Sequence, residues 1–134
     1  MEVTDLILAD YAAANEGGKF TLVGAGIAEI TARKLPCVHP LIFILVRLKV
    51  TRQDIGKNRV DIRLIGEKGT IFKAEADLDV SKDHAEEQYI PLPIQLVNLK
   101  FDLAGDYSIE VRVNGELKQS HNLKIKLLGP QAQK

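Results

Sequence analysis

The sequence has a single cysteine, no tryptophan and no excess of charge of either sign. Cys37 has no second cysteine to join, so an intrachain disulfide is excluded, whereas small secreted β-domains often carry one. Lysine and arginine total 18, and so do aspartate and glutamate, which gives a net charge of zero. Proteins that bind nucleic acids or anionic membranes usually carry a basic excess. We therefore expect a cytoplasmic protein with no nucleic-acid partner.

Long apolar runs are also missing. The longest, residues 41–46, is far shorter than the roughly 20 residues that a membrane-spanning helix needs. The acidic start of the chain is unlike a signal peptide, so no membrane association is expected. A length of 134 residues is typical of one domain. We place this domain at residues 1–128 and expect a flexible polar tail at residues 129–134.

What the chain does contain is a recurring alternation of apolar and polar residues, with turn signals between the runs. This pattern predicts an all-β fold, an antiparallel β-sandwich of about eight strands with an immunoglobulin-like or related Greek-key topology. The expected strands cover residues 4–12, 19–30, 41–51, 59–65, 70–80, 88–99, 107–113 and 117–127. Pro91 and Pro93 cannot donate ladder hydrogen bonds, so their strand is expected at a sheet edge or as an extended crossover. Residues 81–87 allow a single helical turn.

The alternation also predicts the register of two hairpins. Even-numbered apolar residues face the core in both 59–65 and 70–80, and a three-residue loop at 67–69 keeps that parity by pairing Leu64 with Phe72. Gly69 is then expected in a left-handed conformation.

The last hairpin turns at Asn114-Gly115, and its odd-numbered apolar residues are expected in the core: Ile109, Val111, Leu117, Leu123, Ile125 and Leu127. A plain two-residue turn would flip the second strand to the other face. We therefore expect a bulge near the turn, most simply as a three-residue loop with Gly115 in the left-handed conformation.

Three segments together resemble a bacterial family of small proteins known only as a domain of unknown function. They are Leu8-Ala9-Asp10-Tyr11-Ala12, residues 18–26 and Gly105-Asp106-Tyr107. The resemblance covers most of the chain, implies a β-sandwich and supplies no activity or site residues. A glycine two residues before Tyr107 also resembles the tyrosine corner of immunoglobulin-like sandwiches. Ile109 stands where antibody domains have their second cysteine, so their disulfide is absent.

Residues 24–29, Gly-Ala-Gly-Ile-Ala-Glu, imitate the G-x-G-x-x-G dinucleotide fingerprint. The last position must be small so that a helix can pack on the strand, but Glu29 is long and charged. Antiparallel hairpins follow instead of alternating strands and helices. We interpret Gly24 and Gly26 as positions that allow a bulge or a close approach of two strands.

No metal site or cofactor is expected from the cysteine and the histidines. Cys37 and His39 lie two residues apart, while His84 and His121 are far along the chain, and a zinc site needs about four ligands with typical paired spacings. A cysteine nucleophile with a histidine base has no local signature here. A lone buried thiol and ordinary loop histidines are the better interpretation.

Acidic residues suggest a second kind of site. Asp77 and Asp79 project from one face of a strand and Asp83 follows, and calcium prefers carboxylate oxygens of this kind. The alternative is a solvated strand face whose acids pair with Arg59 and Arg63 across the sheet. The sequence leaves open whether these three aspartates bind a cation.

Residues 41–51 are apolar on both faces at their start. Ile42 and the even-numbered residues after it suffice for a core face, yet Leu41, Phe43 and Leu45 occupy the opposite face. A second layer within the domain, such as the proline-containing segment, could cover them. An exposed apolar patch would instead indicate an interface with a second copy or a protein partner, and we predict this interface at Leu41, Phe43 and Leu45.

The sequence therefore favours a non-enzymatic binding or assembly module that self-associates in a bacterial cytoplasm. The alternative is a small-molecule or metal-dependent enzyme of unrecognised type. That enzyme would need several polar residues to converge in one pocket, drawn from Cys37, His39, His84, His121, Asp77 and Asp79.

Overall fold

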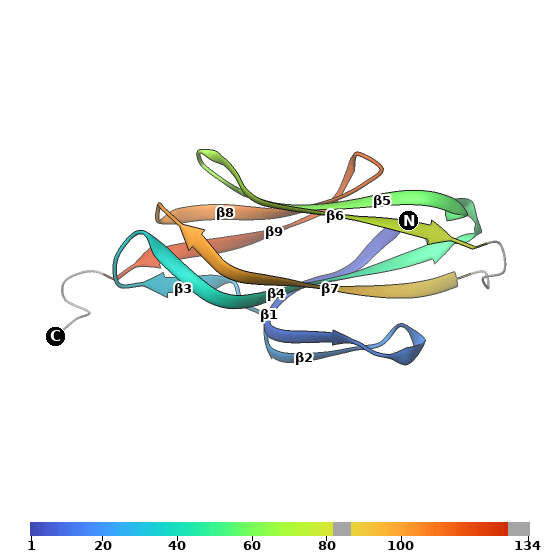
Figure 1. Ribbon diagram of the computed structural model, residues 1–134, viewed down its shortest axis with the longest axis horizontal. Helices are drawn as coiled ribbons and strands as arrows, with labels where there is room; N and C mark the ends of the chain where they lie inside the picture. Colours follow the sequence, from blue (N-terminus) through green and yellow to red (C-terminus); the bar gives the residue numbers. More distant parts are fainter. Residues whose placement is uncertain (82–86, 129–134) are drawn as a thin grey trace.

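The computed structural model describes residues 1–81 and 87–128, which form two stacked β-sheets (Figure 1). One sheet has the strand order β2-β1-β4-β7 and the other the order β3-β9-β8-β5-β6. The expected all-β sandwich is confirmed, and every pairing is antiparallel except that of β3 with β9. Within the described ranges, no helix has the length and hydrophobicity needed to cross a bilayer.

The strands are β1 (Glu2–Ala14), β2 (Phe20–Ala25), β3 (Glu29–Ala32), β4 (Cys37–Thr51), β5 (Gly56–Gly66), β6 (Gly69–Val80), β7 (Glu87–Phe101), β8 (Gly105–Val113) and β9 (Glu116–Leu127). Two 3₁₀ turns, η1 (Glu16–Gly18) and η2 (Arg52–Asp54), follow β1 and β4. The helical turn considered at residues 81–87 falls mostly outside the described residues.

The expected strand at residues 19–30 is two strands in two different sheets. Gly24 and Gly26 have φ angles of 60° and 91°, and the N–H of Gly26 donates to the carbonyl of Leu8 at 2.9 Å. A side chain at Gly24 would overlap that of Asp10. The two glycines thus allow the close strand approach that we inferred for them. They also let the chain change sheets, which raises the strand number from eight to nine.

The proline-containing strand β7 lies at a sheet edge, as expected. It pairs with β4 from Glu87 opposite Thr51 to Phe101 opposite Cys37. The alternation of buried and exposed residues shifts by one position along this strand: Val97 is 60% exposed, whereas Leu99, two residues later, is buried. Asn98, between them, has a φ of 54°.

Both hairpins contain a bulge. Leu64 lies opposite Phe72 as predicted, but Gly66 pairs with Gly69, so the turn has two residues and the register shifts within the strand pair. The β8–β9 turn also has two residues, Asn114 and Gly115, at φ 51° and 84°. Its bulge lies beyond the turn, between the pairs Arg112–Leu117 and Val111–Gln119.

That position of the bulge corrects the predicted core. Leu117 lies opposite the outward-facing Arg112 and is 46% exposed, and Leu127, at the end of β9, is also exposed. The other core residues predicted for this hairpin are buried: Ile109, Val111, Leu123 and Ile125. The hydroxyl of Tyr107 donates to the carbonyl of Leu103 at 2.7 Å, which is the hydrogen bond of a tyrosine corner.

Candidate functional site

β1 pairs with β4 only as far as Ala9, and from there to Ala14 it pairs with β2. This second half of β1 forms with β2 a hairpin that folds over the outer face of β4 as a local third layer (Figure 1). Ala12 of β1 packs with Phe43 and Leu45 of β4 in a second core cluster, and Phe20 and Leu22 of β2 pack against it. Phe43 is 9% exposed and Leu45 is fully buried. This cluster is separate from the main core between the two sheets.

Arg47 fixes the tip of this hairpin to the sheet below. Its guanidinium lies 5.1 Å from the ring centres of both Phe20 and Tyr89. Its Nε donates to Asp5 Oδ2 at 2.8 Å, and a terminal nitrogen lies 3.4 Å from the carbonyl of Gly18. Cation–π contacts and a charge-assisted hydrogen bond therefore act on one side chain.

These contacts correct the expected interface at Leu41, Phe43 and Leu45. The chain's own hairpin covers Phe43 and Leu45, so only Leu41, which is 39% exposed, is open to a partner. The covering layer is the hairpin and not the proline-containing strand.

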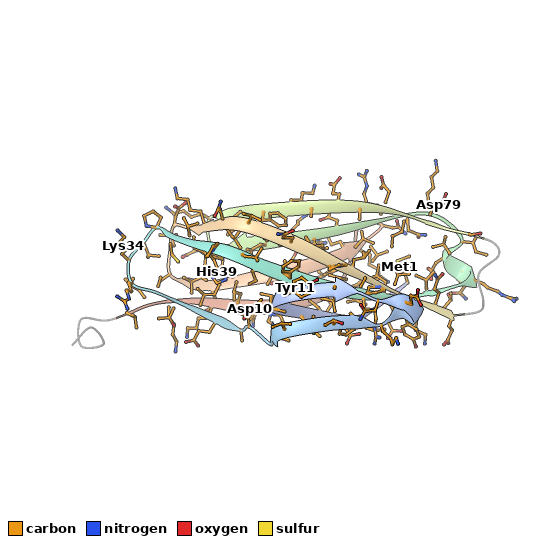
Figure 2. All side chains as sticks on the ribbon, turned by 60° about the horizontal axis from the view of Figure 1, so that its bottom comes forward. Met1, Asp10, Tyr11, Lys34, His39 and Asp79 are labelled. Atoms are coloured by element: carbon orange, nitrogen blue, oxygen red, sulfur yellow. The ribbon has the colours of Figure 1, made fainter. Side chains whose placement is uncertain are left out.

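A smaller apolar patch remains on this face, and we call it the Tyr11 face: Tyr11, Val23, Leu41 and Val97, all exposed. Tyr11 lies opposite Val23, its ring meets that of Phe43 edge-on at 5.3 Å, and Leu41 lies opposite Val97. Figure 2 shows Tyr11 lying over the sheet, with Asp10 nearby. Three of its members are aliphatic, and the hydroxyl of Tyr11 is the one polar side-chain group among the four.

Of the histidines that the structure describes, His39 lies on the same strand as Cys37, and His121 lies in the other sheet. Cys37 and His39 lie opposite the buried Phe101 and Leu99 of β7, and His121 lies opposite Ile109 in the other sheet. His84 lies outside the described residues. Among the residues that the structure places, no three His, Cys, Asp or Glu side chains cluster closely enough to hold a metal ion.

The aspartates of β6 face basic partners across the sheet. Asp77 lies opposite Arg59, with Arg59 Nε 3.4 Å from its Oδ1, and Asp79 lies opposite Lys57. All four side chains line one open hollow, which Asn114 closes at the β8–β9 turn. Asp79 projects outward in Figure 2, and Asp83 is not among the described residues. This arrangement supports the solvated, cross-paired strand face.

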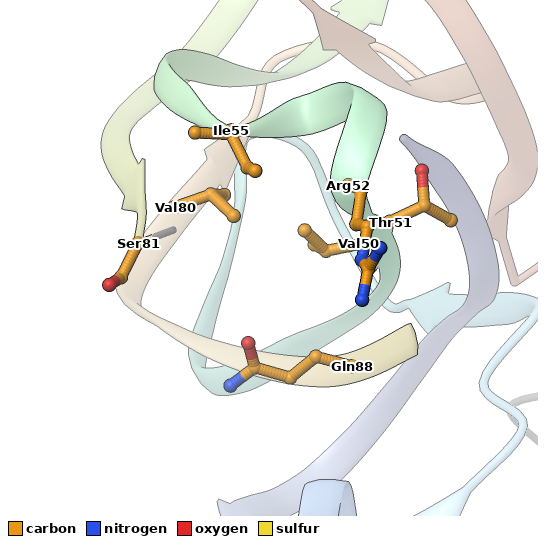
Figure 3. Close-up of a pocket in the computed structure, with 7 residues that line it drawn as sticks. All are labelled: Val50, Thr51, Arg52, Ile55, Val80, Ser81 and Gln88. Atoms are coloured by element: carbon orange, nitrogen blue, oxygen red, sulfur yellow. The ribbon is translucent and has the colours of Figure 1, made fainter. Parts of the chain in front are cut away.

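A narrow pocket lies where β4, β6 and β7 meet (Figure 3). Val50, Ile55 and Val80 line it, and Gln88 forms its floor. Gln88 Oε1 is buried and accepts no hydrogen bond within the described residues. The pocket is too narrow to hold a water molecule and therefore has no room for a ligand. Its lining shows that the end of β6 lies beside the start of β7.

The feature that sequence reasoning missed is the free edge of β6. Its inward-facing residues are apolar but only half-buried: Phe72, Ala74, Ala76 and Leu78. On the outward face Lys73 Nζ lies 2.8 Å from Glu75 Oε1, and Arg59 lies 3.5 Å from the same carboxylate. The hydrogen bond from Lys73 and the charges of Lys73 and Arg59 hold the pKa of Glu75 below its ordinary value. Glu75 is therefore ionised at neutral pH.

The four sheet edges in the described part of the chain differ in how open they are. β3 has four residues, and β2 has six and carries the left-handed Gly24. β7 is long, but Pro91 and Pro93 remove two donors from it. β6 has 12 residues, no proline and no charge on its inward face. It is the edge best able to accept another strand.

Residues 4–126 match a family described as a family of unknown function (DUF6941). A search of the curated proteins finds no match.

Among solved structures, the chain is similar to Pseudomonas fluorescens alkylpurine DNA glycosylase AlkC bound to DNA containing an abasic site analog. The identity is 18% and the TM-score 0.44, over 74% of this chain and 28% of the glycosylase. The expectation that nucleic acids are excluded as partners is corrected by this finding, since a protein partly similar to this chain was solved on DNA. At this TM-score the likeness assigns no ligand to the chain.

Proposed function

Since the chain belongs to this family of unknown function, DUF6941, whose description names no activity, we propose from its structure that it is a non-enzymatic assembly module that associates with a second copy of itself. Support comes from where its unpaired apolar surface lies and from how its polar groups are arranged. His121 lies in the other sheet from Cys37 and His39, and Asp77 and Asp79 face basic partners.

The observation that carries the proposal is the half-covered inward row of β6. Phe72 and Leu78 pack against the main core on one side and stay partly open on the other, because β6 pairs only with β5 in the described residues. Burial of apolar side chains is the main favourable contribution to association. An added strand would cover this row and satisfy the free backbone groups of the edge at the same time.

We place the assembly in a bacterial cytoplasm. The support for this location is the lone Cys37, a free thiol that cannot form an intrachain disulfide, as is usual in a reducing compartment. An immunoglobulin-like relationship is supported by the tyrosine corner at Tyr107.

Light scattering coupled to size-exclusion chromatography tests the proposal on the wild-type chain. A series from low micromolar to several hundred micromolar is expected to approach twice the monomer mass of 14.8 kDa. A mass that stays at the monomer value over the whole series would contradict self-association.

A further inference from the structure

We propose that the partner of β6 is β6 of a second copy, paired antiparallel about a two-fold axis that passes beside Ala74. The inference rests on the self-association proposed above and names the interface and its register. In this arrangement two five-stranded sheets join into one continuous sheet across the axis.

Only a few registers keep the inward-facing side chains of one β6 opposite those of the other. A two-fold axis beside a residue keeps inward side chains opposite inward ones, whereas an axis between two residues would place the apolar row opposite the charged face. The regular part of β6 begins at Phe72, because Ile71 lies in the bulge of the β5–β6 hairpin. The axis must therefore lie beside one of the residues from Phe72 onward.

Charge then selects among these registers. With Ala74 on the axis, Lys73 lies opposite Glu75 of the second copy, and the same pair forms again on the other side of the axis. An axis beside Lys73 or Glu75 places that residue opposite its own copy, which sets like charges against each other. Like charges directly opposite in a sheet destabilise it, and opposite charges stabilise it.

Registers further along β6 are worse. With the axis beside Ala76, Glu75 would face Asp77 of the second copy, and with the axis beside Leu78, Asp77 would face Asp79. An axis beside Phe72 would use the bulged part of the strand and pair no opposite charges. The Ala74 register is the one with two opposite-charge pairs and no like-charge pair.

The inward face fits the same register. Ala74 lies opposite Ala74 on the axis, and the large Phe72 lies opposite the small Ala76 on each side. Regular pairing extends over residues 72–76, about the mean length of a strand. The inward row has no charged residue that would resist pairing.

Charge reversal tests the register. Glu75→Lys places lysines opposite each other at both sites, and Lys73→Glu places glutamates opposite each other, so each variant should raise the dissociation constant at least tenfold. The double variant Lys73→Glu/Glu75→Lys restores both pairs and should recover the wild-type constant. With the axis beside Glu75, the double variant would instead set the glutamate introduced at position 73 against Asp77 of the second copy.

A matched control is available on β9. Lys118 and Glu116 form an ion pair of the same spacing along a strand, 3.6 Å apart and away from β6. Glu116→Lys should leave the dissociation constant unchanged, which separates a local effect from a general effect of charge. Circular dichroism checks that every variant is folded.

Cysteine cross-linking in a Cys37→Ser background gives an independent answer. Opposed residues in an antiparallel pair have Cα atoms about 4.5–5.5 Å apart, within disulfide range. Ala74→Cys should therefore form a covalent dimer on mild oxidation. Glu75→Cys should not, because its two copies would lie about 8 Å apart along the diagonal.

The outcomes separate the two proposals. A wild-type monomer at all concentrations overturns self-association and this inference together. A wild-type dimer that tolerates both single charge reversals and does not cross-link through Ala74→Cys keeps self-association but overturns the β6 interface. Cross-linking through Glu75→Cys in place of Ala74→Cys overturns the register. Dissociation by both single variants, with recovery in the double variant, supports it.

Discussion

The guanidinium carbon of Arg47 lies 5.1 Å from the ring centre of Phe20, so a side chain of β4 anchors the hairpin that crosses over its own strand. Tyr89 of β7 lies at the same distance from this guanidinium. The three residues come from three strands of one sheet. Their contact explains why the hairpin lies on the sheet face and covers Phe43 and Leu45.

Arg47→Lys should lower the free energy of unfolding by about 1–2 kcal/mol. The planar guanidinium contacts two rings while it donates to Asp5, and the compact ammonium of lysine cannot do all three. Urea denaturation measures the change. Arg59→Lys is the control, since Arg59 is exposed and its ion pairs are long, and it should change stability by less than about 0.5 kcal/mol. Equal losses in the two variants would show that the stacked position of Arg47 has no special role.

Phe43→Lys should lower the free energy of unfolding by about 3 kcal/mol or more, since it removes a buried aromatic ring and places a charge under the hairpin. Leu41→Lys, two residues away on the same strand, should cost less than about 1 kcal/mol because Leu41 is partly exposed. Thermal melts followed by circular dichroism compare the two. If the Phe43→Lys protein were folded, stable and monomeric, the result would contradict the covering of Phe43 by the hairpin and would support an interface at Leu41, Phe43 and Leu45.

Gly115→Val should lower the free energy of unfolding by more than about 1 kcal/mol, because Gly115 has a φ of 84° and β-branched residues resist left-handed backbone. Lys68→Val in the other two-residue turn is the matched control, since Lys68 is not among the residues with positive φ. Denaturation midpoints that are equal for Gly115→Val and the wild type would contradict the turn geometry.

Asp54 links η2 to the start of β1. Its Oδ1 accepts a hydrogen bond from the N-terminal ammonium at 2.8 Å, and its Oδ2 accepts one from the N–H of Thr51 at 2.9 Å. Burial acts to raise the pKa of Asp54, but these hydrogen bonds and the ammonium charge together lower the pKa below its ordinary value.

A lowered pKa means that the ionised carboxylate stabilises the folded state above the ordinary aspartate value near 4, and that this contribution is lost as the pH falls through the lowered value. Asp54→Asn should therefore be less stable than the wild type at pH 7 and should lose less stability than the wild type on acidification toward pH 2. Urea titrations at several pH values measure both trends. Parallel pH profiles for the two proteins would contradict this role.

Local features of the fold could be predicted from the sequence because they depend on residues close together in the chain. Alternation placed Leu64 opposite Phe72, the prolines placed β7 at an edge, and the parity conflict at Asn114-Gly115 required a bulge. The position of each bulge could not be predicted, because a two-residue turn with a displaced bulge preserves the same parity as a three-residue loop.

Long-range features could not be predicted in the same way. Phe43 and Leu45 have the same pattern whether a hairpin of this chain or a partner covers them, and only the packing of Ala12 and Phe20 distinguishes the two. The free edge of β6 could not be predicted from the sequence for a related reason. Its alternation is that of any half-buried strand, and edge position depends on how all the strands are ordered.

Hydrogen–deuterium exchange of the wild-type chain at low and high protein concentration tests the central claim most directly, because it reports which backbone amides become covered on association. We predict that, as the protein concentration rises, exchange slows for those N–H groups of residues 72–76 in β6 that point away from β5. The N–H groups at the free edges of β2 and β7 should exchange at an unchanged rate. Exchange in β6 that does not depend on concentration, or slowing confined to the Tyr11 face, would contradict the account.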